Sequence, residues 1–156
     1  MILKETLYSL KDLTIIPFSW SRTDSRDDCK ITYLDQMLPL FTAPMSSLID
    51  VHNQEIFDEY GINTLLPRSI PLKQRMEQWK QGWGIAVSLD EFDTYVYEYE
   101  FNPSTVGYLC VDIANGHMTK LMYSVDKFRT KYPKVNLIVG NIANPDTYEI
   151  FAKLGV

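Results

Sequence analysis

The sequence predicts an α/β protein built around a parallel β-sheet, because short apolar runs alternate with segments of helical periodicity from about residue 38 onward. The runs are almost continuously apolar, which is typical of strands that helices bury on both faces of a sheet. Each run ends in turn residues. The expected strands are residues 38–43, 62–66, 84–88, 108–113 and 137–140.

The segments between these runs carry the signals of crossover helices. The expected helices are residues 48–60, 72–80, 117–132 and 145–155. The third is the clearest, because its apolar residues recur every three or four positions and Pro133 stops it. The fourth has Asn144 as its predicted N-cap and Pro145 at its first helical position.

Two segments are less regular. Residues 90–103 mix acidic and aromatic side chains, which suits a helix or a strand, and we place a helix there because one is due at this position. Residues 1–37 hold a polar stretch between two apolar ones, and we expect a short strand pair followed by a surface loop. The predicted organisation is an N-terminal segment and loop at residues 1–37 and one domain at residues 38–156.

The composition is that of a globular protein, with 46% hydrophobic and 22% charged residues. Because 15 Lys and Arg stand against 20 Asp and Glu, the net charge is −5 and we expect no nucleic acid partner. The apolar runs are strand-sized, and the opening MILKETLYSLKDL carries charges where a signal peptide is apolar. We therefore expect neither a membrane span nor secretion.

The cysteines and histidines do not form a metal-binding pattern. Cys29 and Cys110 lie far apart, and neither they nor the two histidines have partners at metal-ligand spacing. A reduced, cytoplasmic protein without a metal site is the expectation. His52 is expected at the surface or in helix packing, whereas His117 follows a polar turn and could face a ligand.

In a parallel α/β protein the ligand site lies beyond the carboxyl ends of the strands, so the residues after each apolar run are candidates. These are residues 44–47, 67–69, 88, 90, 112–116 and 140–141. The turn at 112–116, Asp-Ile-Ala-Asn-Gly, carries the most chemistry. Asp112 could accept two hydrogen bonds from a ribose or could cap the following helix, and the residues alone leave both interpretations open.

Three further strand-end residues also have two interpretations each. Asn141 could bind a ligand or simply shape its turn. Met45 could lie against a flat ring, although an isolated methionine more often fills a core. Arg68 could hold a phosphate or a carboxylate, although a solvated loop arginine is the commoner case.

The number of predicted strands leaves two architectures open. An open sheet of five strands would be a complete fold, whereas a (β/α)8 barrel needs about 250 residues. Residues 152–156 resemble the end of a helix that runs into the start of another strand. This ending favours part of a barrel.

The strand-end motifs together resemble the IMP dehydrogenase/GMP reductase family. The resemblance is carried, in register, by LPLFTAPMSSLID, GINTLLPRSIPL, GIAVSLDEF, YLCVDIANGHMTKLMYSVDKFRTKYP and LIVGNIANPDTYEIFAKLGV. It runs from about Leu7 to Val156. It implies a (β/α)8 TIM barrel, of which this chain covers about the first five strands.

The resemblance also implies an oxidoreductase that acts at carbon 2 of a purine nucleotide, GMP or IMP, with NADPH or NAD, and a homotetramer when complete. The GMP reductase branch, which deaminates GMP reductively to IMP with NADPH, is favoured. Residues 72–84 leave no room for the regulatory domain usual in the dehydrogenase, and the Ala-Asn-Gly turn is similar to that of the reductase. The alternatives are an IMP dehydrogenase, which oxidises IMP to XMP with NAD, and a non-catalytic nucleotide-binding fragment.

The same resemblance assigns roles to the strand-end residues. The implied cofactor-binding residues are Asp112, Ala114, Asn115 and Gly116. The implied substrate-binding residues are Met45 and Gly140, and the implied catalytic residues are Asn141 and Arg68. In the family these positions surround the purine and the nicotinamide ribose.

The sequence departs from the family pattern at three places. Pro67 and Arg68 stand where the family has a histidine–lysine pair, and Ser46 stands where an aspartate often follows the methionine. The family's catalytic cysteine follows the sixth strand, and neither Cys29 nor Cys110 occupies that place. We therefore expect that cysteine beyond this chain, and no hydride transfer by the chain alone. An unfinished barrel also leaves strand edges open, which predicts marginal stability or association.

Overall fold

The computed structural model describes residues 9–14, 16, 20, 23–29 and 37–156. The chain divides into two units, Met1–Ile31 and Thr32–Val156. In the first unit the described residues include two short 3-10 turns, η1 (Leu10–Asp12) and η2 (Arg26–Asp28). In each, an aspartate side chain accepts a hydrogen bond from the backbone of the serine three residues earlier. The predicted N-terminal strand pair falls largely outside the described residues.

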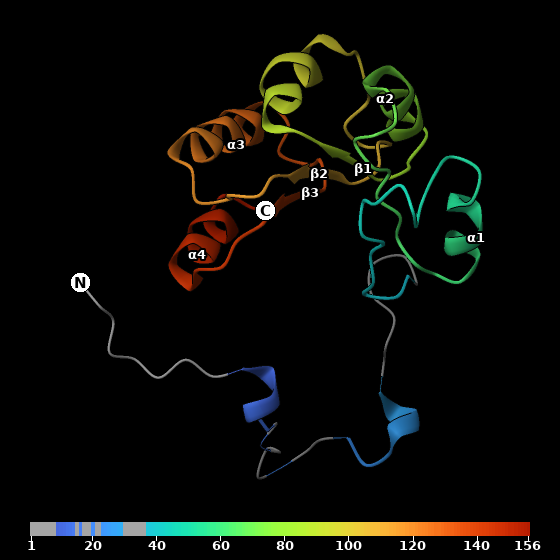
Figure 1. Ribbon diagram of the computed structural model, residues 1–156, viewed down its shortest axis with the longest axis vertical. Helices are drawn as coiled ribbons and strands as arrows, with labels where there is room; N and C mark the ends of the chain where they lie inside the picture. The colour runs from blue at the N-terminus through green and yellow to red at the C-terminus, as the bar shows by residue number, and fades with distance from the viewer. Residues whose placement is uncertain (1–8, 15, 17–19, 21–22, 30–36) are drawn as a thin grey trace. The chain divides into compact units, whose positions relative to one another are not determined.

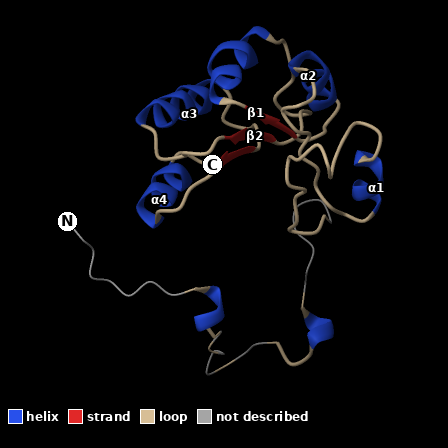
Figure 2. Cartoon of the chain, viewed as in Figure 1, coloured by secondary structure: helices blue, strands red, loops and turns tan. Residues whose placement is uncertain are grey.

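The second unit is built on a parallel sheet of three strands in chain order, β1 (Ile85–Val87), β2 (Leu109–Asp112) and β3 (Leu137–Gly140). Figure 2 shows them side by side at the centre of this unit. The register pairs Leu109 of β2 with Ile85 on one side and with Leu137 on the other. The predicted α/β class and the parallel pairing are confirmed, and each strand lies inside its predicted apolar run.

The first two predicted strands are shorter than expected. They make isolated parallel bridges, one between Phe41 and Asn63 and one from Leu66 to β1. These bridges place the five apolar runs in chain order. A regular ladder between the first two runs does not form, because the Thr42 hydroxyl accepts the amide hydrogen bond of Leu65 at 2.9 Å in place of a backbone carbonyl.

Three of the four predicted helices agree closely with the structure, which has α2 (Leu72–Lys80), α3 (Thr119–Lys131) and α4 (Pro145–Lys153). The N-cap of α4 is Asn144, as predicted. Its side-chain oxygen accepts the amide hydrogen bonds of Asp146 at 2.8 Å and Thr147 at 3.3 Å. Two amides that lack partners within the helix are thereby satisfied.

The first helix, α1 (Gln54–Glu59), begins later than the predicted residue 48. The Asp50 carboxylate accepts hydrogen bonds from the amides of His52 at 2.8 Å and Asn53 at 3.0 Å. The Asn53 side chain returns the contact by accepting the Asp50 amide at 2.9 Å. These local side-chain bonds compete with helical hydrogen bonds and so delay the helix.

Residues 90–103 are helical only in their first half, which corrects the prediction. A π-helical turn, η4 (Glu91–Tyr95), continues into a 3-10 turn, η5 (Val96–Glu98), and the helical backbone ends at Tyr99, which is extended. In the non-helical part, Phe101 packs against Trp79 of α2, with 4.6 Å between ring centroids, and against Tyr132 after α3, at 4.7 Å. Aromatic packing across two helices therefore outweighs the local helical preference.

The two faces of the sheet differ in how they are covered. On one face, alternate strand residues such as Val87 and Val111 are buried in a cluster with Trp79 of α2, Phe128 of α3 and Phe151 of α4. Figure 1 shows α2 and α3 lying along the sheet. The alternate residues of the same strands form a second, smaller cluster on the other face. Its buried members are Leu65, Ala86 and Cys110.

Candidate functional site

The carboxyl ends of the apolar runs carry a shallow hollow of about 320 Å³. Its lining comes from the ends of the first, second and fourth runs: Pro44, Met45, Ser46, Ser47, Pro67, Arg68, Ser69 and Asp112. Parallel pairing places the carboxyl ends of neighbouring strands at one edge of a sheet. For this reason three predicted site residues that lie far apart in the sequence, Met45, Arg68 and Asp112, meet here.

Arg68 and Asp112 form an ion pair in this hollow, with 3.7 Å between Nε and Oδ2. The two side chains are 46% and 32% exposed, so water screens their attraction and the pair contributes little to stability. The contact does orient both groups toward the hollow. Arg68 is therefore neither a freely solvated loop arginine nor a residue far from the predicted site.

The structure excludes one of the two interpretations of Asp112 and one of the two interpretations of Met45. Asp112 does not cap α3, because the N-cap position of that helix is Met118 and no side chain accepts a capping hydrogen bond there. Met45 is 56% exposed and so does not fill the core. Both side chains are thus accessible at the carboxyl ends of the strands.

The turn after β2 is locked against the turn after β3 by backbone hydrogen bonds. Asn141 donates to the Ile113 carbonyl at 2.6 Å, and Gly116 donates to the Asn141 carbonyl at 2.8 Å. A Cβ atom on Gly116 would lie 2.5 Å from that carbonyl oxygen. Glycine is therefore required at residue 116 for the close approach of the two turns.

The other predicted residues of these turns do not line the hollow. Ala114 and Asn141 are exposed, and the Asn115 side chain accepts the His117 amide hydrogen bond at 3.0 Å. A Cβ added to Gly140 would point into open space. Of the two histidines, His52 is exposed on the surface, and His117 contacts the turn after β3.

Sequence reasoning missed a buried ion pair whose arginine contacts the loop that carries Arg68. Arg75 of α2 is 1% exposed, and its guanidinium contacts Glu91 Oε1 at 2.6 Å. It also donates to the Ile70 carbonyl at 2.8 Å and to the Ala86 carbonyl. Arg75 thereby ties the loop that carries Arg68 to β1 and to the loop after it. The sequence did offer one signal for this pair, because Arg75 is a charged residue on the apolar face of helix 72–80.

The environment of Glu91 shifts its pKa. Burial by itself raises the pKa, but hydrogen bonds from Arg75 and from the Ser88 amide, together with the Arg75 charge, outweigh it. The pKa of Glu91 is therefore lowered from its ordinary value. Glu91 keeps its negative charge and closes the loop by accepting the Ser88 amide at 2.8 Å.

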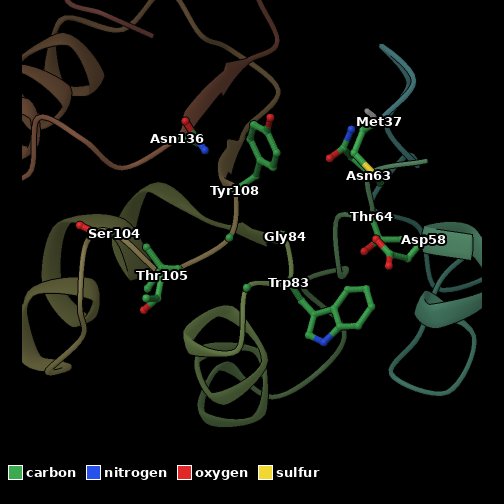
Figure 3. Close-up of a pocket in the computed structure, with 13 residues that line it drawn as sticks. Met37, Asp58, Asn63, Thr64, Trp83, Gly84, Ser104, Thr105, Tyr108 and Asn136 are labelled. Carbon is green, nitrogen blue, oxygen red and sulfur yellow. The ribbon is translucent and has the colours of Figure 1, made fainter. Parts of the chain in front are cut away.

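A larger hollow of about 420 Å³ lies at the opposite end of the sheet (Figure 3). It is lined by residues that precede or begin the strands, among them Asn63, Gly84, Tyr108 and Asn136. Ligands of parallel α/β proteins bind at the carboxyl ends of the strands, whereas the amino ends serve stability. The smaller hollow with Arg68 and Asp112 is therefore the candidate site, despite its size.

Two features are absent from the described part of the chain. No helix there has the length and apolarity that a membrane crossing requires. The described residues also hold no group of three His, Cys, Asp or Glu side chains that could bind a metal ion.

Comparison with known proteins places the sequence in a family. The sequence model described as "IMP dehydrogenase / GMP reductase domain" matches residues 32–156. A GMP reductase of Helicobacter pylori is 24% identical over 151 residues, which is 90% of this chain and 46% of the relative. A GMP reductase of Streptococcus suis is 24% identical over 152 residues, which is 90% of this chain and 45% of the relative.

A third relative covers a shorter stretch at higher identity. The inosine-5'-monophosphate dehydrogenase of Borreliella burgdorferi is 40% identical over 63 residues, which is 40% of this chain and 15% of the relative. The chain spans about half the length of the GMP reductases it matches.

Proposed function

Because the chain belongs to the IMP dehydrogenase / GMP reductase family, we propose that residues 38–156 form the N-terminal part of a (β/α)8 TIM barrel. The five apolar runs support this proposal, since their bridges and ladders are parallel and follow the chain order. The helix-covered face would be the outer face of the barrel. The face with Ala86 and Cys110 would be its interior.

The proposed activity is that of a GMP reductase. GMP, NADPH and two protons would give IMP, NADP⁺ and ammonium. Relatives with this name align over 90% of the chain, which supports the reductase over the dehydrogenase. The observation that carries the proposal for this chain is the meeting of Met45, Arg68 and Asp112 at the carboxyl ends of parallel strands.

The residues of the hollow fit a nicotinamide nucleotide. The Asp112 carboxylate is accessible, and its two oxygens can accept hydrogen bonds from both hydroxyls of a ribose. The neighbouring turn 114–116 would lie along the same cofactor. When bound, NADPH supplies the hydride. Met45 would pack against the purine ring through its flexible thioether, with Gly140 and Asn141 beside the nucleotide.

Arg68 is proposed to act through its charge. An arginine keeps its proton at ordinary pH, so it does not reproduce the proton transfer expected of the lysine in the family pattern. Its guanidinium lies 3.7 Å from Asp112 and can hold that carboxylate in place. It can also stabilise negative charge on a bound nucleotide.

Neither cysteine of the chain suits a nucleophilic role at this site. Burial, with a smaller effect of the Asp112 charge, raises the pKa of the Cys110 thiol to about 12. A thiol with such a pKa is almost entirely protonated at neutral pH and is a poor nucleophile. Cys29 precedes the first apolar run, whereas the family pattern has its cysteine after the sixth strand. We propose that the reacting cysteine comes from outside these 156 residues.

The proposal is tested by nucleotide binding to the chain. Calorimetric titration with NADPH is expected to show binding to the wild type and about 10- to 100-fold weaker binding to Asp112→Ala, because charge-assisted hydrogen bonds to the ribose are lost. Asp126→Ala, a matched change on the exposed surface of α3, is expected to bind like the wild type. A folded wild-type chain without NADPH affinity, or equal affinity in Asp112→Ala, would contradict the proposal.

The dehydrogenase remains the second candidate, because the Borreliella burgdorferi relative is 40% identical where it aligns. Parallel titrations with GMP and NADPH and with IMP and NAD separate the two. Tighter binding of the first pair supports the reductase, and tighter binding of the second supports the dehydrogenase. Binding of a nucleotide without any turnover when the rest of a barrel is supplied would favour a non-catalytic binding role.

A further inference from the structure

The imidazole of His117 connects the turn after β2 with the turn after β3. Its Nδ1 lies 3.0 Å from the hydroxyl oxygen of Thr147, in the first turn of α4. Its Nε2 accepts a hydrogen bond from the Ala143 amide at 3.2 Å. Both ring nitrogens are thus engaged by one neighbouring turn, and neither is left to bind a ligand.

These two contacts determine the tautomer of the ring. A backbone amide can only donate, so Nε2 carries no proton. In a neutral imidazole the proton then lies on Nδ1, which donates to the Thr147 hydroxyl. The partners of the two ring nitrogens therefore place the proton on Nδ1.

Both ends of this contact are held by further hydrogen bonds. The His117 amide donates a hydrogen bond to the Asn115 side chain at 3.0 Å, which holds the backbone of the histidine in place. The Thr147 amide donates a hydrogen bond to the Asn144 side chain at 3.3 Å, which holds the backbone of the threonine in place. The Asn141 carbonyl accepts the Gly116 amide hydrogen bond at 2.8 Å, which is a backbone link between the same two turns.

We propose that His117 is a positioning residue, which holds the turn that carries Asn141 against the turn that carries Asp112. The proposal rests on the proposed function, in which these two residues act on the nucleotide. The backbone bonds of Asn141 set the near end of its turn, and the imidazole sets the far end at Ala143 and Thr147. Without the ring, the Ala143 amide and the Thr147 hydroxyl lose these hydrogen bonds to the β2 side, and the turn that carries Asn141 keeps only its backbone bonds and packing there.

The first test is the tautomer. Nitrogen-15 NMR of the imidazole in the full 156-residue chain is expected to show that the neutral ring carries its proton on Nδ1 and none on Nε2. The reverse tautomer, with the proton on Nε2, would overturn the proposal, because that nitrogen would then face the Ala143 amide as a second donor. A merely packed or solvated ring has no reason to hold the Nδ1 proton.

The second test is hydrogen exchange at the Ala143 amide in four variants. His117→Ala is expected to accelerate exchange about 5- to 10-fold, in line with the loss of one hydrogen bond. Thr147→Val is expected to accelerate it less, and Thr147→Ser, which keeps the hydroxyl, to restore the wild-type rate. Thr130→Val removes a hydroxyl that bonds within α3 and is the matched control. Unchanged exchange in His117→Ala would overturn the proposal.

A third measurement separates this proposal from the proposed function. If the wild type binds GMP, His117→Ala should stay folded and bind it about fivefold more weakly, and Thr147→Ser should bind like the wild type. Equal GMP affinity in His117→Ala would overturn the positioning role. A wild type that binds no GMP would overturn the proposed function, and the tautomer and exchange results would still decide whether the contact forms.

Discussion

The two faces of the sheet come from alternate residues of the same strands, yet they are filled differently. On the helix-covered face, Ile85, Val87, Leu109 and Val111 are completely buried against large side chains from three helices. On the other face, the buried residues are Leu65, Ala86 and Cys110, with Tyr108 and Ile138 partly buried beside them. A hollow of about 440 Å³ borders this second face.

This difference in burial means that the two faces contribute unequally to the stability of the folded chain. Fully burying a large apolar side chain contributes about 1.5–3 kcal/mol, so the helix-covered face supplies most of the hydrophobic stabilisation. The other face contributes less and stays accessible along Ile138 and Tyr108. The proposed site lies at the carboxyl edge of the sheet, supported from the helix side by Arg75. Substitutions on the two faces should therefore separate stability from binding.

The largest expected effect is on the helix-covered face. Phe128 is completely buried, and its ring centroid lies 4.9 Å from that of Phe92 and 5.1 Å from that of Tyr132. Phe128→Ala should lower the free energy of unfolding by about 3–5 kcal/mol, because it removes this packing and leaves a cavity. Urea denaturation measures the change. Tyr123→Ala, on the exposed side of the same helix, should change it by less than about 0.5 kcal/mol.

Removal of the buried guanidinium should have the next largest effect. Arg75→Met keeps much of the volume, but leaves the Ile70 and Ala86 carbonyls without their donor and the Glu91 carboxylate without its partner. We expect the free energy of unfolding to fall by about 2–4 kcal/mol, because removing one partner of a buried ion pair leaves the other without its countercharge. A variant with wild-type stability in urea would show that water replaces the guanidinium without cost.

The stabilisation by Glu91 should depend on pH. Its folded pKa lies below the ordinary value of 4.5, so its contribution is complete above the unfolded pKa and is lost as the pH falls through the folded pKa. The stability difference between wild type and Glu91→Gln should therefore be constant near neutral pH and shrink below about pH 4.5. Glu77→Gln, at an exposed ion pair on α2, is the matched control and should change the stability at neutral pH by less than about 1 kcal/mol. A difference that grows on acidification would contradict the lowered pKa.

The smallest expected effect concerns the open face. Cys110 is buried there, and its pKa is raised to about 12, so almost none of the Cys110 thiol is ionised at pH 8 in the folded chain. A thiol reagent should label the exposed Cys29 quickly and Cys110 only after denaturant is added. Mass spectrometry of the labelled peptides distinguishes the two. Rapid labelling of Cys110 in the folded chain would mean that the second face opens to solvent.

Local patterns in the sequence predicted the elements whose signals are complete within a few residues. The spacing of apolar residues located α2 and α3, and Asn144 with Pro145 located the start of α4. The five strand-end motifs in register predicted the family, and the family match over residues 32–156 confirms it. The sequence patterns did not predict where short polar side chains compete with backbone hydrogen bonds. The Thr42 hydroxyl takes the place of a backbone carbonyl as acceptor for the Leu65 amide, and the contacts between Asp50 and Asn53 make α1 begin later than predicted.

The sequence by itself determined the period and order of the elements, because a buried strand or an amphipathic helix requires its apolar residues at fixed spacing. Only the tertiary structure decided which distant polar groups meet. Arg68 faces Asp112 across two strand ends, and His117 reaches Thr147 across a crossover helix. Such partners are far apart in the chain and leave no local pattern. Their distances depend on how neighbouring strands and turns pack, and this packing assembles the proposed site.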